Sequence, residues 1–181
     1  MNRQMQTGFN LTELLVVVAI VAILLGIGIP SFRYVTNANR ASAEVNGLLG
    51  DLMYARAEAI REGTPVVVCT SADSQSCANV TTWERGWIIC VANAAVTCDN
   101  TTAVLRVQKA FTGTDTLRPD GASNAQAVTF GRMGFASGLN AAGATFTLHD
   151  KTSNMVWSRC LSVTVVGMLT VTNHTATPGC I

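Results

Sequence analysis

A single carboxylate stands at the edge of the most apolar part of this sequence. Glu13 directly precedes a run from Leu14 to Ile29 in which every residue is apolar or glycine. A carboxylate inside a bilayer costs a few kcal/mol on insertion scales, less near the interface, and is tolerated where it is paired. The sequence therefore predicts that Glu13 has a partner.

The second set of chemically capable residues is six cysteines, all of which follow the apolar run. They are Cys69, Cys77, Cys90, Cys98, Cys160 and Cys180. None forms a Cys-x-x-Cys motif, and neither His149 nor His174 has metal-ligand spacing to them. An even number of cysteines in a translocated domain favours disulfides, although buried free thiols would pack as small apolar side chains. We expect at least two disulfides, no metal site and no cofactor.

The cysteines fall into near neighbours along the chain, which suggests Cys69–Cys77, Cys90–Cys98 and Cys160–Cys180 as pairs. In the first two, a strand-like run ends at or near the first cysteine and a polar loop leads to the second. The third would tie the C-terminal tail to a late strand. Each closed loop would stabilise the fold by roughly 2–4 kcal/mol if unstrained.

The N-terminal segment has the length of a membrane span. Residues 9–29 would form about 31 Å of helix, against a bilayer core of about 30 Å. No Ala-x-Ala site follows the run, which disfavours an ordinary secretory leader. Arg3 favours a cytoplasmic N-terminus, so the rest of the chain would lie where disulfides form.

A long helix continues beyond this segment. Apolar residues recur at spacings of three and four at Val45, Leu48, Leu52, Ala55 and Ala59, as on one face of an α-helix. The residues that widen this stripe are Leu49, Met53 and Ile60. We expect Gly63 and Pro65 to end the helix, and Pro30, with Gly26 and Gly28, to bend it.

After Pro65 the sequence changes to short runs rich in β-branched and aromatic residues, separated by Gly, Asn, Asp and Ser. Only 13% of the 181 residues are charged, about half the usual share. These features predict an α+β fold, with one long bent helix packed on a C-terminal β domain. Trp87 should lie in the core, whereas Trp83 could lie in the core or at a rim that contacts another subunit.

The N-terminal residues carry a resemblance to a known class. Gly8-Phe9, Glu13, the run "ELLVVVAI" and Pro30 resemble type IV pilins and pseudopilins. That resemblance implies cleavage between Gly8 and Phe9 by a prepilin peptidase and N-methylation of Phe9. It also implies that Glu13 meets the N-terminal amine of a neighbouring subunit, as an assembly residue rather than a catalytic one.

The rest of the chain narrows the resemblance. "LMYARAEAIREGTPVVVC", "GWIIC", "FGRMGFASG" and "RCLSVTVVGMLTV" are similar to the GspH/FimT family of minor pilins and pseudopilins, whose body is a β-sandwich beside the helix. The implied organisation is a leader (1–8), a transmembrane and assembly helix (9–29), its amphipathic continuation (30–62) and a β-rich periplasmic or extracellular domain (63–181).

This resemblance implies a minor pilin that helps to initiate or cap a type IV pilus. The alternatives are the H-type pseudopilin of a type II secretion system and a FimT-type pilin for DNA uptake. The implied location is the bacterial inner membrane, through a single pass with the body in the periplasm, and then a filament, at its tip. The implied partners are other minor and major pilins or pseudopilins.

Neither catalysis nor DNA binding is favoured by the residues. The histidines are far apart in sequence, so no nucleophile has an evident base. DNA-uptake relatives carry a Gly-Arg-x-Arg segment, but here Gly167 is followed by Met168, Leu169 and Thr170. Only a spatial cluster of basic residues would restore affinity for phosphates. The candidates are Arg106, Lys109, Arg118, Arg132 and Arg159.

Overall fold

The structure is a computed structural model that describes residues 10–121, 123, 125–152 and 155–173. The chain forms two compact units, Met1–Ala38 and Asn39–Ile181, and the division falls inside the long helix α1 (Leu11–Glu62). The two units are therefore described separately. The helix has 52 residues, which confirms the single long helix expected from the sequence.

In the first unit α1 carries the apolar run, and its side chains are exposed along the whole run. The segment has a mean hydropathy of 2.8 and is long and apolar enough to cross a membrane, judged by length and composition. Leu15 and Leu24, for example, are 63% and 65% exposed. Such a surface in water would be unfavourable, so it requires lipid or other helices around it.

In the second unit α1 ends as the sequence predicts. The last helical residue is Glu62, and Gly63 follows with φ of +67°. A residue in this left-handed region commonly ends a helix, and glycine adopts it without the steric penalty of a Cβ atom. Pro65 then leads directly into the first strand, so the chain reverses direction within a few residues.

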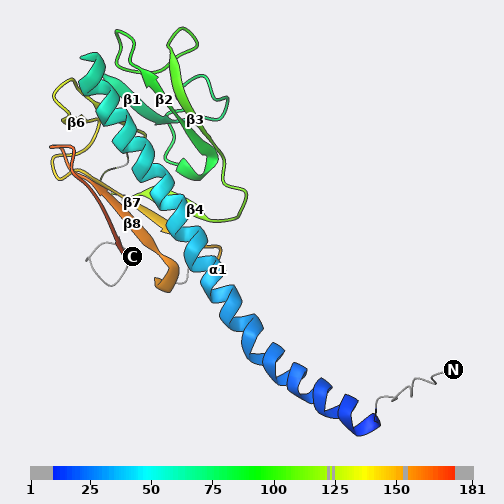
Figure 1. Ribbon diagram of the computed structural model, residues 1–181. Coiled ribbons are helices and arrows are strands. Elements are labelled where there is room, and N and C mark those ends of the chain that lie inside the picture. Colours follow the sequence, from blue (N-terminus) through cyan, green and yellow to red (C-terminus); the bar gives the residue numbers. More distant parts are fainter. Residues whose placement is uncertain (1–9, 122, 124, 153–154, 174–181) are drawn as a thin grey trace. The chain divides into compact units, whose positions relative to one another are not determined.

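Two antiparallel sheets make up the rest of the second unit (Figure 1). The first sheet, called sheet A, has the order β3-β2-β1-β5-β6, and sheet B has the order β4-β7-β8-β9. The strands are β1 Val66–Thr70, β2 Gly86–Val91, β3 Val104–Lys109, β4 Thr116–Pro119, β5 Ala127–Phe130, β6 Ala136–Ser137, β7 Ala144–His149, β8 Arg159–Val163 and β9 Leu169–Asn173. Two short 3₁₀ helices, η1 (Trp83–Arg85) and η2 (Met155–Trp157), precede β2 and β8.

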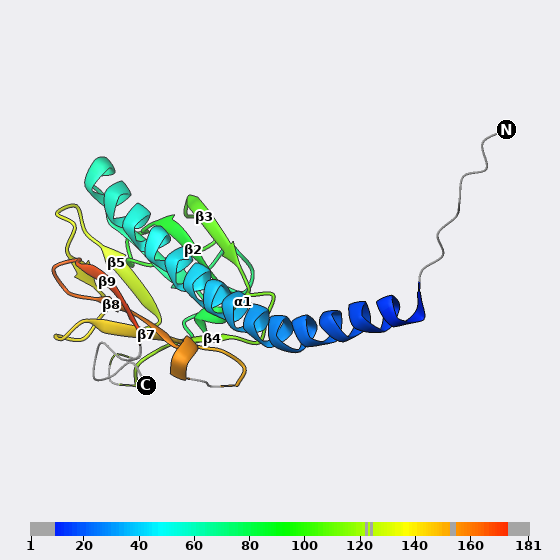
Figure 2. The same cartoon turned by 60° about the horizontal axis from the view of Figure 1, so that its bottom comes forward.

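The core lies between the C-terminal half of α1 and the two sheets, as Figure 2 shows. The predicted stripe of Val45, Leu48, Leu52, Ala55 and Ala59 is completely buried there. Small alanines let the helix approach the sheets closely, and the branched residues fill the space between strands. The sequence also predicted that Met53 and Ile60 extend this buried stripe. That prediction is wrong, because their side chains are 57% and 52% exposed.

Two tryptophans join the helix and the sheets. The ring of Trp83 lies edge-on to Phe146 of sheet B, with centroids 4.9 Å apart, and its Nε1 donates to the Ala125 carbonyl at 2.9 Å. Trp87 lies in β2, and its Nε1 donates to Asp51 Oδ2 of α1 at 2.8 Å. Trp83 is completely buried, so its alternative reading as a rim residue is wrong.

A cluster of charged side chains fastens α1 to the start of β4. Arg40 donates from Nε and Nη2 to the two oxygens of Asp115, at 2.7 and 2.8 Å. Glu44 lies one turn further along the helix, and its buried Oε2 accepts no hydrogen bond from the described residues. Burial, and then the Asp115 carboxylate, raise the pKa of Glu44 to about 7, although Arg40 opposes the shift. Protonated Glu44 can donate to Asp115, whereas ionised Glu44 repels it.

We predict that Glu44→Gln makes the protein more stable at pH 8 and less sensitive to pH. The pKa of Glu44 is raised from 4.5 in the folded state, so its contribution to stability is fully present below pH 4.5 and is lost as the pH rises through about 7. Glutamine keeps a donor for Asp115 without the charge. Because solvent screens this partly exposed group, we expect a gain on the order of 1 kcal/mol at pH 8.

Thermal unfolding of the full-length protein in detergent between pH 4.5 and pH 8 measures this effect. Glu62→Gln is the matched control, because Glu62 lies on the same helix but its side chain is 49% exposed. An unfolding temperature that falls equally for wild type and Glu44→Gln over this range would contradict the prediction.

Candidate assembly site

Glu13 lies in the first turn of α1 and is exposed. The N–H groups of Glu13 and Leu14 both donate to the Asn10 carbonyl, at 3.0 and 3.2 Å, which starts the helix. A carboxylate in the first turn interacts favourably with the positive end of the helix dipole. No ion pair involves Glu13 among the described residues 10–38, so its pairing with a cation of another subunit stays a prediction.

Two neighbours of Glu13 one turn further along the helix are apolar and exposed, Val16 by 56% and Val17 by 50%. Asn10, one turn before Glu13, is polar and also exposed. In a medium of low dielectric constant, a carboxylate beside apolar side chains attracts an approaching cation more strongly than it does in water. This geometry suits a helix that receives another helix with a positive group at the same level.

Three of the predicted site residues are not tested by these contacts. Gly8 and Phe9, at the predicted cleavage junction, lie outside the described residues. Pro30 lies within α1, but its side chain is not among those described. Cleavage and methylation at Phe9, and a bend caused by Pro30, remain predictions.

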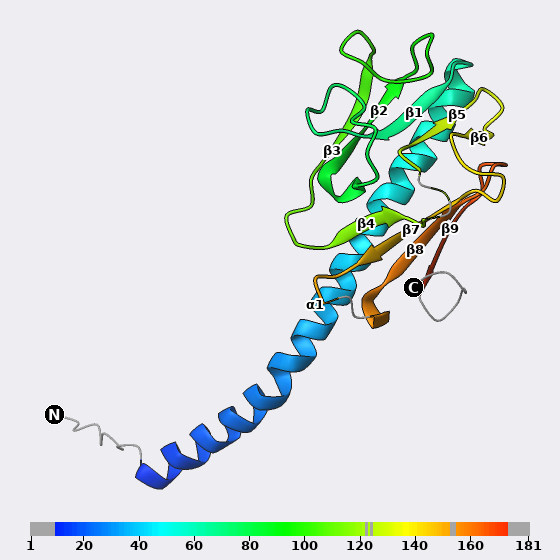
Figure 3. The ribbon, with the colours of Figure 1, turned by 180° about the vertical axis from the view of Figure 1, so that it is seen from behind.

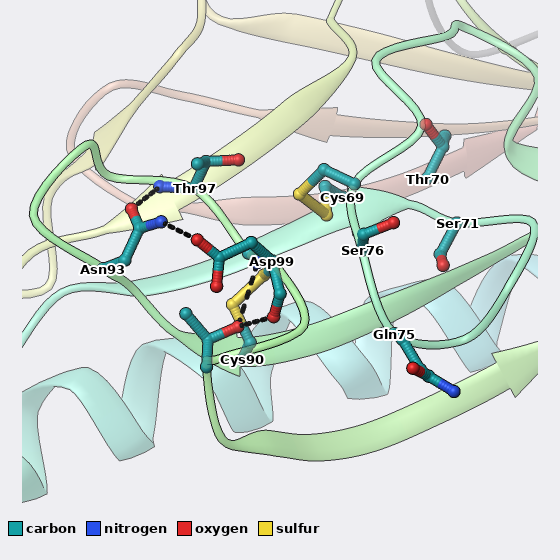
Figure 4. The surroundings of a disulfide bond; sticks show 12 residues. Cys69, Thr70, Ser71, Gln75, Ser76, Cys90, Asn93, Thr97 and Asp99 are labelled. Carbon is teal, nitrogen blue, oxygen red and sulfur yellow. Dashed lines mark hydrogen bonds between the residues drawn. A yellow bond between two sulfur atoms is a disulfide. The ribbon is translucent and has the colours of Figure 1, made fainter.

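Two disulfides cover the face of sheet A that points away from α1 (Figure 4). They join Cys69 to Cys77 and Cys90 to Cys98, the two pairs suggested by the sequence spacing. The β1–β2 register sets Cys69 opposite Ile88 and Val67 opposite Cys90, so both strand cysteines point to the same side. These residues and Cys98 form a second, smaller buried cluster.

The two disulfide loops also contact each other. The Cys77 N–H donates to the Cys98 carbonyl at 3.2 Å, and the sulfur atoms of Cys69, Cys77 and Cys98 lie within 4.8 Å of one another. Metal binding by cysteine requires thiolates, and these sulfurs are held in disulfides. The cluster therefore stabilises the loops and does not offer a metal site in this state.

An aspartate organises each loop. Asp73 accepts hydrogen bonds from the Ser76 hydroxyl at 2.6 Å and from the N–H groups of Gln75 and Ser76 at 2.9 Å, and the pKa of Asp73 is held well below its ordinary value. Asp99 accepts from the Thr101 hydroxyl at 2.6 Å, which lowers the pKa of Asp99. Asn93 donates to Asp99 at 2.7 Å across its loop (Figure 4). Both loops are thus held by charge-assisted hydrogen bonds as well as by disulfides.

Only one cysteine of the third predicted disulfide lies among the described residues. Cys160 lies in β8, is almost completely buried and is disulfide-bonded. Cys180 and His174 lie outside the described residues. The pair Cys160–Cys180 therefore stays a prediction.

One histidine lies close to a serine hydroxyl, which is the arrangement that could in principle activate a nucleophile. His149 Nδ1 and Ser158 Oγ are 3.1 Å apart. Ser158 is completely buried, so its hydroxyl cannot meet a substrate in this conformation. The pair instead connects the end of β7 to the start of β8.

The basic residues that could have formed a phosphate-binding face lie on or beside strands of both sheets, and three of them have partners within the fold. Arg106 pairs with Asp51 at 2.9 Å, and Arg118 pairs with Glu84 at 2.6 Å. Arg159 donates from Nη1 to the carbonyls of Val156 and Ser158. Lys109 is on edge strand β3, whereas Arg132 follows β5 towards the opposite edge of sheet A. The described residues therefore do not bring these five cations together.

Sequence reasoning missed the polar link through Asp51. Asp51 is only 7% exposed and bridges Trp87 and Arg106. Its position three residues after Leu48 and four before Ala55 puts it beside the buried stripe, but helical spacing cannot identify its partners, which come from β2 and β3. The Arg106 guanidinium also lies over the Tyr54 ring, 5.1 Å from its centroid.

Comparisons with known proteins agree on one class. A sequence model of the family described as "Type II transport protein GspH" matches residues 44–167, more than half of the chain. No curated protein sequence matches the chain.

Solved structures share the fold. Two crystal forms of the type IV minor pilin FimU from Pseudomonas aeruginosa are similar at 22% and 21% identity, with TM-scores of 0.56 and 0.58. They cover 79% and 83% of this chain, and 99% of FimU in each case. The minor pseudopilin EpsH of the Vibrio cholerae type 2 secretion system is similar at 13% identity with a TM-score of 0.52, over 74% of this chain and 96% of EpsH. The family match, the long helix and the two antiparallel sheets together show that the chain belongs to the GspH/FimT family of minor pilins and pseudopilins.

Proposed function

We propose that this protein is a minor pilin that helps to initiate or cap a type IV pilus through packing of its N-terminal helix. The observation that carries the proposal is the exposed carboxylate of Glu13, which sits among exposed apolar side chains at the start of a helix that continues into a GspH-family body. Lipid surrounds the apolar segment before assembly, and neighbouring helices replace the lipid in the filament.

In the proposed mechanism, Glu13 sets the register in which neighbouring helices pack during assembly. Cleavage after Gly8 creates an amine at Phe9, and Glu13 of one subunit pairs with that amine of the next. An ion pair in a medium of low dielectric constant is strong and falls off with misplacement, so it favours one register over its neighbours. The bulk of the binding free energy comes from the apolar side chains around it.

A role as an H-type pseudopilin of a type II secretion system is the second candidate. The matching family, described as a type II transport protein, and the likeness to EpsH favour it. The helix chemistry would be the same in both systems. The disulfide-fastened loops on the outer face of sheet A favour the pilus, since they suit an exposed filament. The neighbouring genes, for pilus subunits or for a secretion apparatus, discriminate between the two.

Gly8→Val should leave the precursor uncut in the inner membrane, because a branched side chain would block a peptidase that accepts glycine at this position. The wild-type protein should begin at Phe9, carry a methyl group on its amine and retain the apolar helix. Intact-mass analysis of the purified protein measures both. Gln4→Asn in the leader is the control and should be processed normally. A wild-type mass that corresponds to a cut after Leu25 or later would refute this processing.

Glu13→Val should be inserted and cleaved normally, because insertion of an apolar residue is easier than insertion of a carboxylate. Its recovery in sheared filaments should fall at least roughly tenfold, which corresponds to about 1.4 kcal/mol of lost pairing. Leu15→Val is the control on the same helix and should assemble like wild type. Recovery of Glu13→Val at wild-type stoichiometry would count against the pairing mechanism.

A further inference from the structure

The body exposes a group of apolar side chains that its own fold leaves uncovered. They come from three segments that are distant in sequence: the C-terminal part of α1, the β5–β6 turn and the β8–β9 turn. We call this group the apolar patch, and it consists of Met53, Ile60, Met133, Phe135, Val166 and Met168. Each is between 52% and 71% exposed, in a second unit whose core is formed by buried apolar residues of α1 and the two sheets.

The backbone holds these segments together. The Ala136 N–H donates to the Val165 carbonyl at 2.9 Å, which joins the two turns. Gly167 has φ of +78°, and an added Cβ would lie 2.2 Å from the Gly134 carbonyl oxygen, so the turns touch through their backbones. Figures 1 and 3 show the β5–β6 and β8–β9 turns side by side from opposite directions.

Arg56 links α1 to the β5–β6 turn. Its Nε donates to the Gly134 carbonyl at 3.1 Å. Met53, Ile60 and Met168 then line a groove of about 420 Å³ on the surface. The patch is therefore preformed, and little conformational entropy is lost when a partner covers it.

The grouping and residue types of the patch indicate a protein partner. Contiguous exposed apolar patches beyond a few hundred Å² are rare on monomeric proteins and mark interaction sites. Methionine is flexible and polarizable, so it adapts to the shape of a partner.

The charge at the patch indicates what that partner presents. Arg56 and the exposed Arg132 flank Gly134, and neither pairs with a carboxylate among the described residues. The nearby acids of α1, Glu58 and Glu62, both pair with Arg61. Two uncompensated guanidinium groups beside an apolar surface complement a surface with carboxylates at its edge. They would oppose a symmetric contact between two copies of this patch.

We propose that the apolar patch docks the globular body of a different pilin-type subunit, which presents an apolar surface bordered by carboxylates. This inference rests on the proposed function, because it takes the partner from the same filament. It adds a second contact to the one at Glu13, made by the body rather than by the N-terminal helix. The segment from Gly167 to Thr170, where DNA-uptake relatives carry arginines, then serves protein contact through Met168.

Site-specific photocrosslinking of the full-length protein in its own cells tests the proposal. A benzophenone amino acid replaces Met133 or Met168 in turn, with Val107 as the control position, because Val107 is 45% exposed on β3 and lies outside the patch. We expect both patch positions, but not the control, to crosslink to a different pilin-type subunit, identified by mass spectrometry. Arg132→Glu should reduce the yield from Met168 at least fivefold.

Other crosslinking results overturn the inference. These are adducts only with a second copy of this chain, adducts only with lipid, yields no higher than at Val107, and no effect of Arg132→Glu.

Met168→Glu and Val107→Glu provide a second readout through filament recovery, and equal recovery of the two variants would also overturn the inference. Loss of assembly in Glu13→Val with normal assembly in Met168→Glu would leave the proposed function intact and reject only the patch. Absence of the wild-type protein from filaments would instead reject the proposed function.

Discussion

The burial of one helical stripe between two sheets is the interaction on which the rest of the body depends. Ala41, Val45, Leu48, Leu52 and Ala59 leave water together and bring sheet A and sheet B against the same helix. Neither sheet could bury its inner face alone, because each has one apolar side that needs a covering layer. Trp83 completes this arrangement, since its ring contacts Phe146 in one sheet and lies 6.2 Å from the Trp87 ring in the other.

The two parts of α1 differ in the surroundings that suit their side chains. From Leu14 to Ile29 its side chains are apolar in every direction and exposed, as suits lipid or a bundle of like helices. In its second unit only one stripe is buried, and polar groups such as Arg40 and Asp51 fasten its edges to the strands. The proposed function uses this contrast, because the first part assembles with other helices while the second carries the body.

Different surfaces of the body contribute to its stability and to the proposed contact with another subunit. The outer face of sheet A is closed by disulfides and by aspartates whose hydrogen bonds hold the loops, so it offers few unsatisfied groups. At the other side, the turns around Gly134 and Gly167 are fixed by backbone contacts but leave their flanking side chains open. Stability thus comes from groups that are paired, and the proposed contact with another subunit comes from groups that are not.

Local sequence patterns determined the long helix, its end at Gly63, the change to β structure after Pro65 and the buried stripe, because each depends on residues a few positions apart. Spacing along the chain also suggested Cys69–Cys77 and Cys90–Cys98, whose partners close loops between neighbouring strands. The expected widening of the stripe failed because Met53 and Ile60 directly follow Leu52 and Ala59, about 100° further around the helix, and face outward. Spacing also could not identify the partners of Asp51, which come from β2 and β3. Only the tertiary structure decided the pairing of Arg106 and Arg118 with carboxylates and the joining of three apolar segments into one patch, because both depend on which helices, strands and turns become neighbours in space.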